Sequence, residues 1–506
     1  METAEVAALP EPAAYQVAPR RRLVRNVAVL LSSQIVTWSL TMLWTVFVPR
    51  ALGPAQLGEL TVATSVSTIL GAIVSLGIGT LMVREISRDH DRAGRLVGAA
   101  LVGRLVLLPP SLMAVLLYTR LTHSGPELTV VIWLSAAAML LGLFGGPFMA
   151  ALQALERMQY IAYSDVLSKA VVAGASVALV LAGLRLVPLM VLGLAMAVVT
   201  VALSCWWGAR YFKVVLRVPW GEVWRLAVGS LPYWSTGLLL TFYMWIDSLM
   251  LAAMTPIRVV GWYGVPTKLF GSLLFIPVIL STAYLPRLSR AFRSGRGQLI
   301  AEGRPALELV LILSLPIATG VALVAPSLIW VLYGRAFLPS VPVLVIMAGC
   351  IPPTYLNVMA NQVLIAANRQ LDWTKVMAGA AVLNPLLNLV LIRYAQAHWH
   401  NGALGAALAL LATEILMLAA ALWLMPRMFR WSTLGRVGRA VVATALMAAA
   451  VWGVERFNRG LVVQVSVGLI TFSVLAVALR VLTREELAEG RRIAGGMVRR
   501  VRGARA

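Results

Sequence analysis

Long runs of apolar residues, separated by short polar loops, repeat along the whole chain. Each run is about 20 residues long, the length at which an α-helix crosses a bilayer. The apolar residues within a run are continuous and do not alternate with a period of two, so the pattern favours helices over the strands of a barrel. It predicts fourteen transmembrane helices, over 27–48, 60–83, 96–118, 128–150, 164–183, 188–209, 229–253, 262–285, 305–330, 341–365, 376–392, 402–425, 438–454 and 461–479.

The composition supports this interpretation. The chain has 506 residues, of which 60% are hydrophobic and only 12% are charged. A soluble protein of this length needs far more charged side chains on its surface. The sequence therefore predicts an all-α polytopic membrane protein.

The net charge of +23 would suggest nucleic-acid binding in a soluble protein. Here, however, most lysines and arginines lie in every second loop, starting with the N-terminal segment. By the positive-inside rule, this distribution places both termini in the cytoplasm. It also favours contact with anionic lipids of the inner leaflet, and we expect no nucleic-acid partner.

The two terminal segments are predicted to be cytoplasmic. Residues 1–26 are polar and rich in proline and alanine, which is typical of a disordered segment. Residues 480–506 form a basic tail. A capping box from Thr483 to Glu486 predicts that the tail starts a helix on the inner membrane surface.

The short loops leave little room for catalysis. They contain no glycine-rich phosphate-binding loop and no pairing of a nucleophile with a base. His398 and His400 alone make a poor metal site, and Cys205 and Cys350 both fall inside predicted spans. We therefore expect a transporter without catalytic residues, cofactor or metal; an enzyme is the weaker alternative.

Two parts of the chain resemble each other. Residues 57–88 match residues 260–290 in pattern, and Arg157 and Arg369 follow spans 4 and 10 at the same offset. Six spans later the chain returns to the same orientation, so this is a parallel repeat with its axis along the membrane normal. It predicts two six-helix lobes, with two extra helices after them: 27–212 for the N-terminal lobe, 213–228 for the cytoplasmic linker, 229–425 for the C-terminal lobe and 438–479 for the extra helices.

Several motifs, in this order and spacing, carry a resemblance to a known family: PRALGPAQLGEL, WIDSLMLAAMTPIRVVGWYGVPTKL, STAYLPRLSR, LYGRAFLPSVPVLVIM, LIAANRQ, NPLLNLVLI and NGALGAALALLATE. The chain resembles the oligosaccharide flippase (polysaccharide transporter) family of the multidrug/oligosaccharidyl-lipid/polysaccharide exporter superfamily. The resemblance covers residues 27–425.

The resemblance implies a flippase of the bacterial inner membrane that moves lipid-linked oligosaccharides from the inner to the outer leaflet by alternating access. Polysaccharide-assembly proteins are further expected partners. One alternative is a cation-coupled multidrug exporter, which would be expected to carry a carboxylate in its first span; residues 27–48 contain none. Another is a non-transporting scaffold, although a scaffold has little reason to bear charges within the membrane.

Asp247 interrupts the apolar run 238–254. A charge near the bilayer centre costs about 2.5–3.5 kcal/mol on insertion scales, so a partner is expected. Lys268 lies at nearly the same depth in the next span and is the predicted partner across the hairpin. The pair would either fix the hairpin or act as a switch on the cavity wall.

Arg104 lies about eight residues inside the third span, and Glu414 near the middle of the twelfth. The arginine side chain can extend back to the headgroups, or its planar fork can bind the phosphate of a lipid carrier. Glu414 is too deep to reach the surface. It is a candidate site for a proton or a cation, or a partner for an arginine in the cavity.

Four asparagines form two pairs with helical i, i+4 spacing. Hydrogen bonds between helices are the favoured role for them, and a sugar-binding rim is the alternative. With the charged residues above, they complete the predicted cavity lining: Arg104, Asp247, Lys268, Glu414, Asn357, Asn361, Asn384 and Asn388.

Overall fold

The structure is a computed structural model that describes residues 20–122, 124–425, 428, 431–457 and 460–481. The described residues are helical, without strands. Two 3₁₀ turns, His90–Arg92 and Arg335–Phe337, join longer helices. The helices are α1 (Arg20–Ser75), α2 (Ile78–Arg88), α3 (Ala93–Leu121), α4 (Pro126–Ala154), α5 (Met158–Leu181), α6 (Leu186–Ala209), α7 (Trp220–Met254), α8 (Ile257–Leu273), α9 (Phe275–Arg293), α10 (Arg296–Tyr333), α11 (Ser340–Ala366), α12 (Gln370–Trp399), α13 (Gly402–Leu424), α14 (Trp431–Phe457) and α15 (Leu461–Ala478).

The fourteen predicted spans are present. The described residues contain thirteen apolar helical segments long enough to cross a membrane, and the first of them, Val36–Arg88, covers two predicted spans. These two spans meet at Gly53, whose φ of 74° and ψ of 174° break the helical geometry of α1. Glycine adopts this positive φ without the strain that a side chain would bring.

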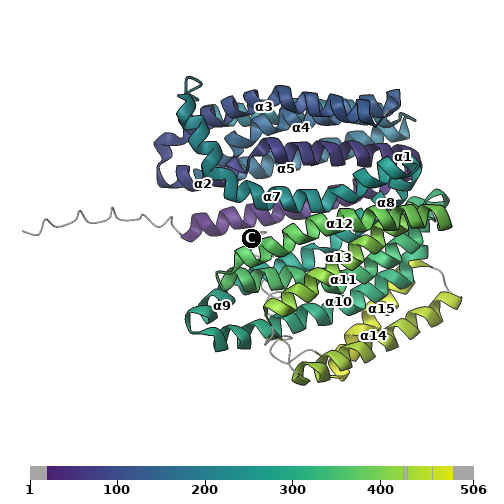
Figure 1. Ribbon diagram of the computed structural model, residues 1–506. Coiled ribbons are helices and arrows are strands. Elements are labelled where there is room, and N and C mark those ends of the chain that lie inside the picture. The colour runs from purple at the N-terminus through teal and green to yellow at the C-terminus, as the bar shows by residue number, and fades with distance from the viewer. Residues whose placement is uncertain (1–19, 123, 426–427, 429–430, 458–459, 482–506) are drawn as a thin grey trace, which may run out of the picture.

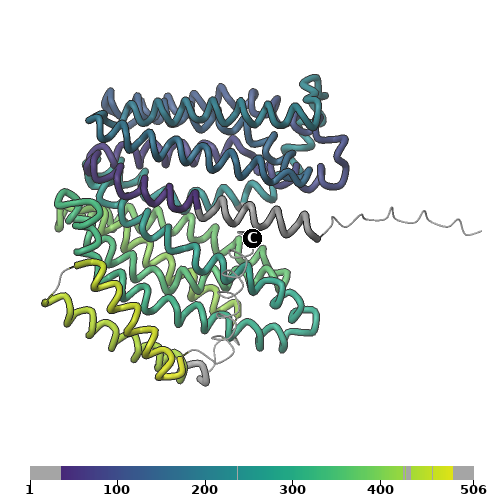
Figure 2. Tube along the Cα trace, turned by 180° about the vertical axis from the view of Figure 1, so that it is seen from behind, coloured from purple at the N-terminus to yellow at the C-terminus, as the bar shows by residue number. Residues whose placement is uncertain are grey.

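The helices form two bundles, as Figures 1 and 2 show. The first lobe contains α1–α6, the second contains α8–α13, and α14 and α15 pack against α10 on the far side of the second lobe. We call the end of the molecule at which α1 begins the inner end, on the left of Figure 1, and the opposite end the outer end.

The helix α7 belongs to both lobes. Near its start, Val223 and Leu226 pack in one cluster with Met82 and Ile86 of the first lobe. Further along, Tyr243 and Leu251 pack in a cluster that includes much of the second lobe. Part of the predicted linker, 213–228, is therefore helical from Trp220 onward, and α1 likewise starts at Arg20, within the N-terminal segment predicted to be disordered. The predicted helix at Thr483 lies outside the described residues.

The eighth predicted span is two helices, α8 and α9, with a break at Leu274. Pro277 explains the break, because it has no N–H to donate to the carbonyl of Leu273 one turn earlier. The hydroxyl of Tyr355 on α11 donates to that carbonyl instead, at 2.8 Å. A kink in the second lobe is thus compensated by a neighbouring helix.

The two lobes meet at the outer end, where α1 and α8 cross. A Cβ atom on Gly58 would collide with the carbonyl of Ile257, and one on Gly261 would collide with the carbonyl of Pro54. Deeper in the crossing, a Cβ on Gly264 would lie 2.8 Å from Oγ1 of Thr61. These glycines allow backbone-to-backbone contact, which is how membrane helices associate most closely.

Gly261→Ala should therefore open the outer end. The added methyl group overpacks the crossing by about 1–3 kcal/mol, enough to shift an opening equilibrium by about fivefold or more. Gly271→Ala on the same helix is the matched control, because a Cβ there meets open space. In a protein that carries Thr61→Cys, a membrane-impermeant maleimide applied from the outer side should label faster with Gly261→Ala than with Gly271→Ala. Equal labelling rates would contradict a close-packed outer gate.

Candidate functional site

Asp247 of α7 is a buried carboxylate that accepts hydrogen bonds from two neighbouring helices. Only 3% of the residue is exposed. The Tyr263 hydroxyl of α8 donates to its Oδ2 at 2.7 Å, and Nδ2 of Asn388 of α12 donates to its Oδ1 at 2.7 Å. The same Nδ2 donates to Oδ1 of Asn384, at 2.9 Å. These neutral donors compensate the loss of hydration, which a buried charge requires.

Glu414 of α13 has an equivalent arrangement, and one of its donors stands one turn before Asp247 on α7. The Tyr243 hydroxyl donates to its Oε1 at 2.9 Å, and Nδ2 of Asn357 donates to its Oε2 at 2.8 Å. Tyr243 and Asp247 stand at i, i+4 on α7, so the two hydrogen-bonded groups meet on one face of this helix. We call them together the carboxylate network: Asp247, Glu414, Tyr243, Tyr263, Asn357, Asn384 and Asn388.

The predicted ion pair between Asp247 and Lys268 is wrong. Among the described residues, no ion pair joins the two side chains. Nζ of Lys268 lies 4.7 Å from the centre of the Trp44 ring on α1 instead. Lys268 follows Tyr263 by five residues, about 140° around the helix, so with Tyr263 turned to α7 the lysine faces the first lobe. It makes a cation–π contact between the lobes.

The asparagines bridge helices, but their acceptors are carboxylates. Asn357 and Asn388 are buried and donate across helices to Glu414 and Asp247, and Asn384 accepts from Asn388 within α12. Asn361 is half-buried and lies outside the carboxylate network in the part of the chain described. Three of the four asparagines thus form buried hydrogen bonds within the second lobe.

Arg104 has the opposite environment. Its residue is 5% exposed, and neither Nε nor Nη1 has a hydrogen-bond partner within the described residues. The guanidinium lies against Gly146 of α4, where a Cβ would stand 3.4 Å from Nη1. The side chain is enclosed by protein rather than extended to the headgroups, and no described carboxylate pairs with it. It is a buried cation without a counter-charge.

Gly146 also lines a cavity of about 630 Å³ between α2, α4 and α5. Arg104 contacts Gly146 but is not itself a lining residue of this cavity. The other lining residues are Gly79, Thr80, Val83, Arg84, Met149, Ala150, Gln153 and Ile161.

Sequence reasoning missed Arg84 and Tyr233. Nη1 of Arg84 donates to the Tyr233 hydroxyl at 3.1 Å, and its Nη2 lies 2.9 Å from Oε1 of Glu85. Arg84 lines the first cavity, and Tyr233 lines a second one of about 320 Å³ between α1, α4 and α7. The sequence pattern could have identified Arg84, because the helical pattern of 78–88 continues past it and places this arginine on the helix rather than in the loop.

A family comparison supports the sequence resemblance. The sequence profile of a family described as "Polysaccharide biosynthesis protein" matches residues 23–292, just over half of the chain. A search of curated protein sequences gives no significant match.

Solved structures show the same fold. The structure of "Lipid II flippase MurJ, inward closed conformation" superposes with a TM-score of 0.73 at 12% identity, covering 91% of this chain and 100% of that one. A multidrug resistance MATE family transporter in an inward-facing conformation gives 0.60 at 15% identity, covering 78% and 98%. One in an outward-facing conformation gives 0.51 at 15% identity, covering 80% and 95%. The chain thus has the fold of this superfamily of transporters.

Asp247→Asn and Lys268→Met should destabilise the protein independently. The two side chains share no partner, so their effects on the free energy of unfolding should add within about 0.5 kcal/mol. Asp247→Asn and Asn388→Leu should instead be coupled by about 1 kcal/mol or more, because the first change places an amide opposite donors that the second removes. Unfolding of the purified variants in detergent measures both cycles. Strong coupling between the changes at 247 and 268 would instead support an ion pair between Asp247 and Lys268.

Proposed function

The chain belongs to the polysaccharide biosynthesis protein family, and we propose that it is a flippase. It moves lipid-linked oligosaccharide or polysaccharide precursors across the bacterial inner membrane by alternating access, with both termini in the cytoplasm. Polysaccharide-assembly proteins are its expected partners. It carries out transport and not catalysis.

The observation that carries this proposal is the unpaired buried cation at Arg104. A charge enclosed in a membrane protein is costly without a counter-charge, and such residues typically mark a substrate path. Lipid carriers of sugars hold their negative charge in phosphate groups at the boundary between lipid and sugar. The fork of an arginine binds phosphate oxygens in pairs. Arg84 adds a second cation, because it lines the cavity that is also lined by Gly146, the neighbour of Arg104.

The closed outer end supports an alternating-access cycle. Gly58 and Gly261 bring α1 and α8 into contact there, and Nη1 of Arg50 on α1 donates to the carbonyl of Val331 on α10 at 2.7 Å. The higher TM-score with the inward-facing MATE transporter than with the outward-facing one agrees with this state. In the proposed cycle these contacts break when the lobes rock to release substrate outward.

A cation-coupled drug exporter is the second candidate, and the carboxylate network favours it. Two buried carboxylates surrounded by neutral donors can exchange a proton or hold a monovalent cation. The same network can serve a flippase as its coupling site. The charge near the proposed substrate site distinguishes the two functions. A buried arginine attracts an anionic substrate such as a lipid phosphate and repels a cationic drug.

Arg104→Gln should abolish display of surface polysaccharide while the protein remains at its normal level in the membrane. Arg104→Lys should restore only part of it, because a point charge lacks the paired donors of the guanidinium. Arg120→Gln is the matched control, since Arg120 is an exposed arginine of the same helix. The measurement is surface glycan in cells that depend on this protein. Normal glycan display by the Arg104→Gln variant would show that Arg104 does not bind the substrate phosphate. Loss of drug resistance with normal glycan display would favour the exporter.

A further inference from the structure

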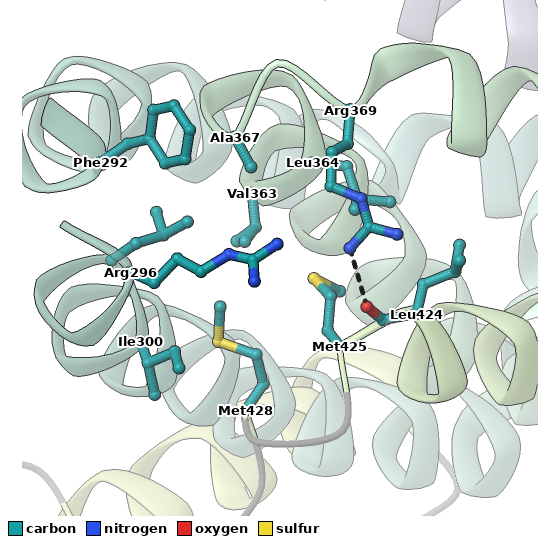
Figure 3. A pocket seen from close by; sticks show the side chains of 11 residues that line it. Phe292, Arg296, Ile300, Val363, Leu364, Ala367, Arg369, Leu424, Met425 and Met428 are labelled. Carbon is teal, nitrogen blue, oxygen red and sulfur yellow. Dashed lines mark hydrogen bonds between the residues drawn. The ribbon is translucent and has the colours of Figure 1, made fainter.

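A separate cavity of about 450 Å³ opens at the inner end of the second lobe, between α9, α10, α11 and α13. Figure 3 shows it from close by. Most of its wall is apolar. Its lining consists of Phe292, Arg296, Leu299, Ile300, Val363, Leu364, Ala367, Arg369, Leu424, Met425 and Met428.

The two arginines of this cavity differ in their contacts. Nε of Arg369 pairs with Oδ2 of Asp372 at 2.7 Å, and its Nη1 donates to the Leu424 carbonyl at 3.0 Å. Arg369 thereby ties the start of α12 to the end of α13. The guanidinium of Arg296 instead points into the cavity, between Val363 and Met428 (Figure 3). It forms no ion pair with a described residue, and no carboxylate lines the cavity.

An apolar wall that carries one arginine without an ion pair among the described residues suits an amphiphile whose anionic group stays near the membrane surface. We propose that this cavity binds an anionic phospholipid of the inner leaflet, with its phosphate at Arg296 and an acyl chain along Ile300, Val363 and Met428. Methionine is flexible, so the wall can adapt to chains of different shape. Basic side chains on the neighbouring turns of α9 add to the positive potential: Arg287, Arg290 and Arg293.

The two other possible occupants fit less well. The transported substrate is proposed to bind beside Arg104 in the first lobe, whereas this cavity is enclosed by helices of the second lobe alone. The C-terminal residues 482–506 carry many arginines, so their charge repels Arg296. A bound phospholipid would join the α9–α10 hairpin to α11 and α13, the helices that hold Asn357 and Glu414 of the carboxylate network.

The test is lipid binding by the purified full-length protein, measured by native mass spectrometry. Phosphatidylglycerol and phosphatidylcholine with the same acyl chains are titrated separately. Since one basic residue near an anionic headgroup is worth about a fivefold change in affinity, the protein should prefer phosphatidylglycerol by at least that factor, and Arg296→Gln should remove the preference. Arg335→Gln, at an exposed arginine just beyond the other end of α10 that does not line the cavity, should keep it.

A second variant tests the apolar wall. Ala367→Phe places a ring in the cavity and should reduce tight binding of both lipids, with thermal unfolding confirming that the variant folds. If the Arg296→Gln protein still prefers phosphatidylglycerol as strongly as the unmodified protein does, the proposal is overturned. Unchanged lipid binding by Ala367→Phe would overturn it too. Phosphatidylglycerol binding that rises when residues 482–506 are removed would overturn it as well, in favour of the tail as occupant. None of these measurements depends on transport, so they test the lipid site independently of the flippase proposal.

Discussion

The structure depends on how buried charged side chains are stabilised inside the two lobes, away from water. In the second lobe, Asp247 and Glu414 are each surrounded by neutral hydrogen-bond donors from other helices, so their cost is met within the protein. In the first lobe, Arg104 is equally buried but has no counter-charge in the described residues. The buried carboxylates of the second lobe thus have hydrogen-bond donors, whereas Nε and Nη1 of Arg104 in the first lobe have no partner among the described residues. This asymmetry distinguishes the two lobes despite their common repeat.

Close packing of backbone sets the relation between the lobes. Gly58 and Gly261 allow α1 and α8 to touch at the outer end, where any side chain would separate them. Lys268 of the second lobe makes a further contact with the first by lying over Trp44. Both contacts are local and contain no buried ion pair, so separating the lobes leaves no carboxylate without a partner. A gate of this kind can open at modest cost.

The fold followed from the sequence because bilayer thickness fixes the length of each apolar run, and the order of the runs fixes the lobes. Contacts between helices did not follow, since they depend on the rotation of each helix about its axis. Asp247 and Lys268 have matching depths, but α8 turns Tyr263 toward the carboxylate and Lys268 away from it. Tyr243 and Tyr263 were overlooked because aromatic residues are common in membrane helices and reveal a partner only in three dimensions.

The helix α7 is where the two halves of the site meet. Tyr233, in its first half, accepts a hydrogen bond from Arg84 on a cavity of the first lobe. Trp234 donates from its ring nitrogen to the carbonyl of Ala72, also in the first lobe, at 3.0 Å. Tyr243 and Asp247, two to four turns later, belong to the carboxylate network. In the proposed cycle, an anion that draws Arg84 away from Tyr233 loosens the first half of α7 from its lobe. Because the same helix carries Asp247, that movement reaches the carboxylate network without any further contact between the lobes.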